Sequence, residues 1–148
     1  MVMAKVTWSD GEGKAKESEI MKVEKALGIR FPDDYRTFVK THRGGTPSPQ
    51  ELKIRGRRSP AVVRTLLNFI PDDASDYILE NHDWIKDRLA SGLVPIAKDP
   101  GGNYICFDFR GKGVPTVVWW EHEDNARRKL LPIAASFTKL LDSLYEEE

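Results

Sequence analysis

The sequence has little cysteine and no long apolar run. Cys106 is the only cysteine in 148 residues, which excludes an internal disulfide and fits a reducing compartment. No segment approaches the roughly 18 consecutive apolar residues that a membrane span needs. The N-terminus carries no apolar run of signal-peptide length. These absences predict a soluble, cytoplasmic protein that makes no membrane contact.

An excess of charge of either sign is also missing. The 23 Lys and Arg residues balance the 23 Asp and Glu residues, so the formal net charge is +0. Dedicated nucleic-acid binders normally carry a basic excess, so this balance argues against direct nucleic-acid binding. The charges are nevertheless segregated, because residues 53–64 are basic and residues 72–87 are mainly acidic. Such segregation steers a charged partner, and ordinary surface charge with local pairing is the alternative.

Catalytic and metal-binding motifs are absent as well. The chain contains no GxGxxG, no GxxxxGK[ST] and no GxSxG. His122-Glu123 begins like a zincin motif, but Ala126 stands where the second histidine is needed. Cys106 lies in an apolar run without a neighbouring base, which is typical of a small core residue. We therefore expect no enzymatic activity, no catalytic residue, no cofactor and no metal.

Three β-prone runs are the most informative feature that the sequence does contain. They lie within residues 93–121 and are separated by two Gly-rich connections, a pattern that predicts a meander of three antiparallel strands. In the middle run, Ile105, Phe107 and Phe109 share one face, because side chains alternate along a strand. We expect helices to cover that face.

Helical spacing predicts the remaining elements. Helices are expected over residues 16–27, from Pro32 to the Gly44-Gly45 pair, over 76–89 with Asp76 as N-cap, and over 133–144. Residues 52–55 are a candidate short strand, and residues 61–70 fit a strand or a short helix. The order predicts a single α+β domain with a central, mostly antiparallel sheet, on which N-terminal and C-terminal helices pack. Its expected division is a flexible arm (1–15), the domain (16–145) and an acidic tail (146–148).

Trp119 and Trp120 are the candidate partner-binding residues. Adjacent strand residues point to opposite faces, so at most one indole belongs to any one face of the sheet. One is then accessible as an interface anchor unless a helix or the arm covers it, and these two alternatives stay open. An acidic group follows directly. The candidate partner-binding patch is Trp119, Trp120, Glu121, Glu123 and Asp124.

A spaced signature lies near the N-terminus. It comprises Glu24, Leu27, Gly28, Phe31, Pro32, Tyr35 and Phe38, followed by Gly44-Gly45. Together with the strands of residues 93–97, 102–108 and 117–122 and the helix of residues 134–144, this signature resembles the SUKH superfamily, which includes yeast cell-wall assembly regulators and many bacterial immunity proteins. One departure is Arg43, because the family's helix usually ends in Asn-Gly-Gly.

The resemblance implies a non-catalytic, protein-binding α+β module. Bacterial members neutralise a toxin domain, often a nuclease, by covering its active surface, so we expect a protein partner of that kind. The neutral net charge weakens the nuclease version, because nuclease inhibitors are often strongly acidic. A regulatory scaffold, as in the eukaryotic members, is the main alternative, and a small-ligand binder or an unrecognised enzyme comes next. The expected assembly is a monomer or a weak homodimer.

Overall fold

The computed structural model describes residues 6–9, 13–42, 44–57, 59–71, 75–122 and 130–145. The described helices are α1 (Glu17–Leu27), α2 (Asp33–Val39), α3 (Ile78–Ile85) and α4 (Phe137–Asp142). The main sheet contains β5 (Thr65–Leu66), β6 (Leu93–Lys98), β7 (Tyr104–Asp108), β8 (Thr116–Trp120) and β9 (Leu130–Ala134). Two smaller sheets are formed by β1 (Thr7–Ser9) with β2 (Thr46–Ser48) and by β3 (Glu51–Leu52) with β4 (Ala61–Val62).

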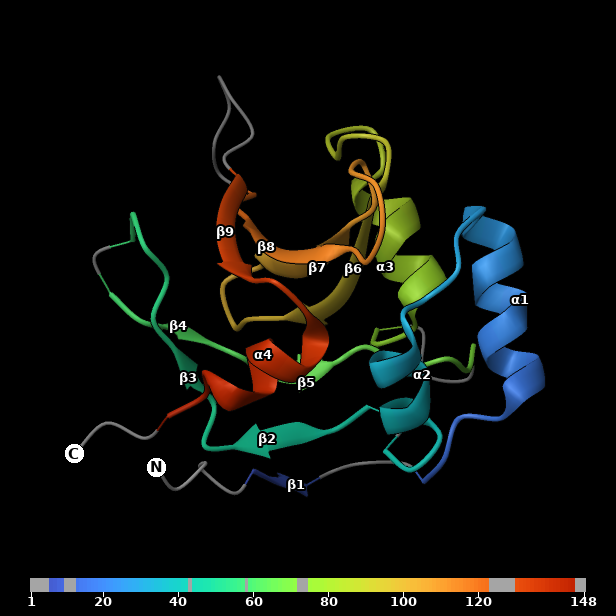
Figure 1. Cartoon of the computed structure of the whole chain (residues 1–148), viewed down its shortest axis with the longest axis horizontal. Helices are drawn as coiled ribbons and strands as arrows, with labels where there is room; N and C mark the ends of the chain where they lie inside the picture. The colour runs from blue at the N-terminus through green and yellow to red at the C-terminus, as the bar shows by residue number, and fades with distance from the viewer. Residues whose placement is uncertain are drawn as a thin grey trace.

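The main sheet is an antiparallel meander in the order β5-β6-β7-β8-β9. The three strands predicted within residues 93–121 are therefore confirmed as β6, β7 and β8. The sheet curves strongly, and α1 and α2 lie on the opposite side of the molecule from β3 and β4 (Figure 1). Helices combined with a mostly antiparallel sheet confirm the predicted α+β class.

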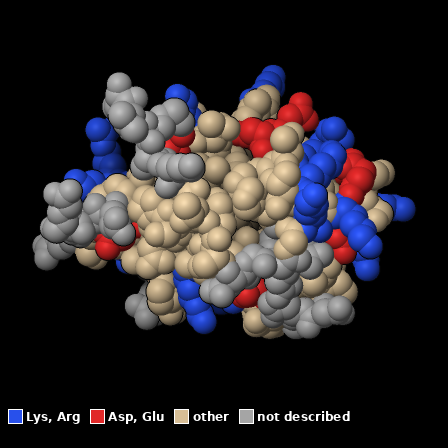
Figure 2. Space-filling model, turned by 90° about the horizontal axis from the view of Figure 1, so that it is seen from below, with Lys and Arg blue, Asp and Glu red and all other residues tan. Residues whose placement is uncertain are grey.

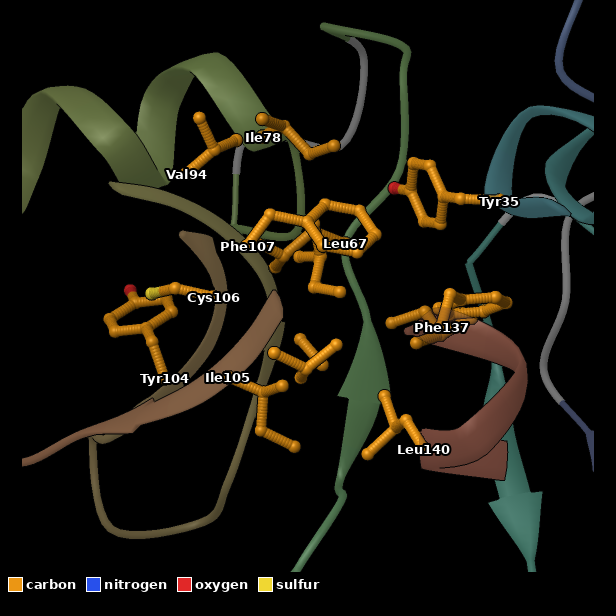
Figure 3. Close-up of a cluster of buried hydrophobic side chains, with 14 of the residues drawn as sticks. Tyr35, Leu67, Ile78, Val94, Tyr104, Ile105, Cys106, Phe107, Phe137 and Leu140 are labelled. Atoms are coloured by element: carbon orange, nitrogen blue, oxygen red, sulfur yellow. The ribbon is translucent and has the colours of Figure 1, made fainter. Parts of the chain in front are cut away.

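The helix-covered face of β7 holds the aromatic core. Phe107 packs edge-on against Tyr35 of α2, with ring centroids 5.1 Å apart, and Tyr35 in turn contacts Phe137 of α4 at 5.0 Å. Figure 3 shows Tyr104 and Cys106 pointing to the other side of the same strand. This confirms the predicted division of the two faces, and Cys106 is a fully buried core residue.

A buried carboxylate joins the two N-terminal helices. Glu24 is only 7% exposed, and its side chain accepts hydrogen bonds from the backbone N–H of Phe31 and from the guanidinium of Arg36. Arg36 also pairs with Glu17, at 2.8 Å. Gly28 ends α1 in the left-handed conformation, with φ 69°, as its sequence position predicts. The polar residue on the apolar stripe of α1 is therefore a structural connector between α1 and α2.

Segments toward both ends of the described chain contact the rest of the domain. Within the expected flexible arm (1–15), Thr7–Ser9 form β1, which pairs with β2, and Trp8 packs on Phe38 with ring centroids 5.1 Å apart. At the other end, the carboxylate of Asp34 accepts hydrogen bonds from the backbone and the hydroxyl of Thr138, at 3.0 and 2.9 Å. That contact connects α2 to the start of α4. The predicted tail, residues 146–148, lies outside the described residues.

Several element boundaries differ from the sequence prediction. The helix expected from Pro32 to the Gly44-Gly45 pair ends already at Val39, and the strand expected over 52–55 is the shorter β3. The helix expected over 133–144 begins only at Phe137, because Ile133 belongs to β9 and Ser136 caps the helix by accepting from the N–H of Lys139. The helix expected over 76–89 is shortened to α3, because Asp76 forms an ion pair with Lys98 at 2.7 Å instead of capping it. Residues 61–70 form two short strands, β4 and β5. No helix in the described part of the chain has the length and apolar character that crossing a membrane requires.

Replacing Glu24 with alanine tests the role of the buried carboxylate. The change leaves the guanidinium of Arg36 and the N–H of Phe31 without their acceptor, and breaking such a buried pair costs about 3–5 kcal/mol. Urea unfolding of Glu24→Ala should show that loss, whereas Lys25→Ala, an exposed change on the same helix, should stay within about 0.5 kcal/mol of the wild type. A Glu24→Ala variant as stable as Lys25→Ala would contradict the structural role.

The ion pairs of Glu17 predict a loss of stability in acid. Hydrogen bonds from Arg36 and then Lys40 lower the pKa of Glu17 from 4.5 to about 2. Because the pKa is lower in the folded chain, the stabilisation is complete above pH 4.5 and is lost as the pH falls toward 2. The free energy of unfolding of Glu17→Gln, followed over this range, should fall less steeply than that of the wild type. Equal slopes would show that Glu17 contributes nothing to the acid sensitivity.

Candidate partner-binding surface

Both tryptophans of the predicted patch are buried. Trp119 and Trp120 are each 0% exposed, so the structure adopts the alternative in which both indoles are covered. Trp119 lies opposite Ile105 on one face of the sheet, and Trp120 lies opposite Tyr104 on the other. Neither indole is therefore an exposed anchor, and neither can touch a partner directly in this structure.

The loop between β3 and β4 covers Trp119. The guanidinium of Arg57 lies over the indole, 4.9 Å from its centroid, and donates to the carbonyl oxygens of Ser59 and Pro60 at 3.0 and 3.1 Å. At the turn, Gly56 has φ 94°, and a Cβ there would lie 3.4 Å from Leu131 of β9. This close approach holds the loop against the sheet.

A different segment covers Trp120. The guanidinium of Arg88, in the turn after α3, lies 5.3 Å from the centroid of this indole, and the ring of Tyr104 lies 6.1 Å away. The Tyr104 hydroxyl donates to the side-chain oxygen of Asn81 in α3 at 2.6 Å. Two arginines distant in sequence thus protect the two indoles, one on each face. The sequence contains no local signal for either contact.

Glu121 is the accessible member of the predicted patch. Its side chain is 25% exposed, and one oxygen accepts from the indole N–H of Trp119 at 2.9 Å and from Nε of Arg57 at 3.4 Å. The structure therefore brings the basic segment 53–64 and the first acidic residue after β8 together. Glu123 and Asp124 lie outside the described residues.

A groove opens beside this cluster. It encloses about 400 Å³ and is bounded by Lys53, Ile54, Arg55, Arg57, Pro60 and Tyr145. We call Lys53, Arg55, Arg57, Glu121 and Tyr145 the loop face. Tyr145 is fixed beside β3, because Tyr145 and Glu51 exchange two backbone hydrogen bonds, at 3.0 and 3.3 Å.

A second concavity lies at the Gly44-Gly45 pair. It encloses about 330 Å³, and its lining includes Arg64, Asp76 and Lys98. Lys98 is already engaged there, since its ammonium group pairs with Asp76 at 2.7 Å and donates to the carbonyl of Ser75. The charges of Lys98 and Asp76 therefore neutralise each other, and Arg64 adds one further cation to the lining.

One face of the molecule carries few charges at its middle. Figure 2 shows this broad face, seen from below Figure 1, whose middle is occupied by side chains without charge and whose Lys and Arg residues lie toward the margins. The middle of this face therefore offers few groups for ion pairs.

The single thiol and the possible metal ligands bear on the chemistry that the described residues can perform. Burial raises the pKa of the Cys106 thiol, so the thiolate needed for nucleophilic attack is disfavoured. Within the described ranges, no group of three His, Cys, Asp or Glu side chains is placed to hold a metal ion. Among the charged groups of the loop face, Arg57 and Glu121 are paired, whereas Lys53 and Arg55 are exposed.

The sheet, the helix pair locked by Glu24 and the charged loop face define a single α+β domain with a candidate interaction surface. The sequence model of the SMI1 / KNR4 family (SUKH-1) matches residues 14–143, and the chain belongs to this family. The chain is also similar to the SPbeta prophage-derived uncharacterized protein YokK of Bacillus subtilis (strain 168). The two are 26% identical over 146 residues, which cover 87% of this chain and 74% of the relative.

Removing the guanidinium of Arg57 should open the loop over Trp119. Arg57→Ala loses the cation–π contact and two carbonyl contacts, so we expect a stability loss of about 1–2 kcal/mol. Hydrogen exchange of the Trp119 indole N–H, followed by NMR, should become faster. Arg55→Ala, which removes an exposed cation from the same loop, is the control and should leave that exchange unchanged. Protection of the Trp119 N–H in Arg57→Ala equal to that in the wild type would contradict the covering role.

Proposed function

We propose that this chain is a non-catalytic, cytoplasmic protein-binding module of the bacterial immunity type, which neutralises a toxin domain by covering its working surface. Membership of the SUKH-1 family supports the proposal, and the similarity to a prophage-derived bacterial protein is consistent with it. The proposed module acts as a monomer or a weak homodimer.

The single observation that carries the proposal is the construction of the loop face. Partner binding is strongest when the contact groups are already held in place, because little conformational entropy is then lost. Arg57 fixes its own loop through two carbonyls, and Glu121 is oriented by both Arg57 and the indole of Trp119. A charged rim held over a buried aromatic residue has the arrangement of an interface with a polar edge.

Occlusion explains how such a module works without chemistry. A surface that covers the substrate site of a toxin blocks catalysis by exclusion, and the inhibitor needs affinity and shape but no reactive group. The buried Cys106 fits this requirement, because its thiol is not accessible for chemistry. The proposed partner is therefore a folded toxin domain.

Co-expression in a sensitive bacterial host tests the proposal. The toxin domain to use is the variable C-terminal domain of a large secreted protein encoded beside this chain. The wild-type chain should restore growth, and Glu121→Lys should lower survival by about tenfold or more, because it removes the acceptor that orients both Arg57 and the indole of Trp119 and so disturbs the loop face.

The matched control is Asp87→Lys, an exposed acidic residue after α3 and away from the loop face. This variant changes the net charge by the same amount and should protect as the wild type does. Failure of the wild type to protect, together with recovery of several housekeeping proteins in a pull-down, would favour a regulatory scaffold instead.

A further inference from the structure

We infer that the partner of the loop face contributes an acidic segment, whose carboxylates enter the groove formed by Lys53, Arg55 and Arg57. This inference rests on the proposed function and specifies the chemistry of the partner. It implies that the covered surface of the toxin is acidic at this point of contact, in contrast to the basic nucleic-acid-binding surface of a nuclease.

The charge of the groove favours an acidic partner. Three of its lining side chains are cations, and no Asp or Glu is among the described residues that line it. Lys53 and Arg55 are exposed, and within the described part of the chain neither has an ion-pair partner. Nε of Arg57 lies 3.4 Å from one carboxylate oxygen of Glu121, and this long contact leaves part of the Arg57 charge unneutralised.

Two of the cations are held in position around the groove. Lys53 lies over the ring of Tyr145, 5.5 Å from its centroid, and Arg57 is held by the carbonyls of Ser59 and Pro60. These contacts fix the positions of two cations about the groove before a partner arrives. Guanidinium groups bind carboxylates with paired, parallel hydrogen bonds, which favours Asp and Glu side chains as the incoming groups.

The size of the groove argues for a peptide segment over a nucleic acid. A volume of about 400 Å³ accommodates a few side chains and not a duplex. Nucleic-acid affinity grows with the number of phosphates that are neutralised, and a surface with three cations in a chain of net charge +0 neutralises few. An acidic protein segment needs only these cations and the neighbouring backbone.

The inference can be tested with a fluorescein-labelled peptide of about eight glutamates. The peptide is titrated with the full chain, and binding is followed by fluorescence anisotropy. The wild type should bind it with an affinity that falls as salt rises. Lys53→Glu/Arg55→Glu should weaken peptide binding by about tenfold or more. The milder Lys53→Gln/Arg55→Gln should have an affinity between those of the wild type and the charge-reversed variant. Both positions are exposed, so these variants should unfold at the wild-type temperature.

The matched control is Lys22→Glu/Lys112→Glu, which reverses two exposed cations away from the groove, on α1 and in the β7–β8 connection. It should bind the peptide within about twofold of the wild type, because only the net charge changes. Equal weakening in this control and in the groove variant would overturn the inference, and so would no detectable peptide binding by the wild type.

Two further arms separate other occupants of the groove. Tighter binding of a DNA duplex of the same charge, lost in the groove variant, would replace the acidic peptide with a nucleic acid and overturn the inference. Peptide binding that appears only after Glu146, Glu147 and Glu148 are all changed to Gln would make the chain's own C-terminal residues the occupant. If toxin protection persists in Lys53→Glu/Arg55→Glu, the proposed function stands and this inference fails.

Discussion

The buried carboxylate of Glu24 is the constraint on which the arrangement of this domain depends. It accepts from Phe31 and from Arg36, so it sets where the chain leaves α1 and how α2 crosses it. That placement puts Tyr35 against Phe107, the centre of the aromatic core between α2 and the sheet. A buried ion pair is weak support for stability in itself, but here it also satisfies a backbone N–H, which no apolar pair of the same volume could do. Its value lies in specifying one helix arrangement among several that the same apolar stripe would allow.

Sequence patterns predicted the sheet better than the elements around it. Three β-prone runs with Gly-rich turns were enough for β6, β7 and β8, because alternation and hairpin chemistry are local properties. The C-terminal helix was placed too early, since Ile133 and Phe137 share helical spacing although Ser136 between them is the actual cap. The N-terminal strand β1 was missed because its pairing with β2 joins residues about forty positions apart, and such a contact leaves no local pattern.

The candidate site was predictable only in part. The place of Glu121 after an apolar strand makes it a candidate, and composition marks the basic segment 53–64. That these two regions touch is a tertiary fact, visible in the contact of Arg57 with both Glu121 and Trp119. The expectation that Trp119 or Trp120 serves as an exposed anchor is not met, because arginines from two distant segments cover the indoles. Alternation correctly placed the two rings on opposite faces, but it contains no information about what lies above each face.

The attachment of Thr138 to Asp34 has a consequence for synthesis in the cell. The second helix makes this contact with a residue about a hundred positions later in the sequence, and Tyr145 lines the groove. On the ribosome the early helices therefore emerge well before the residues that hold them in place, and the groove takes shape only after Tyr145 has been synthesised. A nascent chain that ends before this residue lacks one wall of the groove.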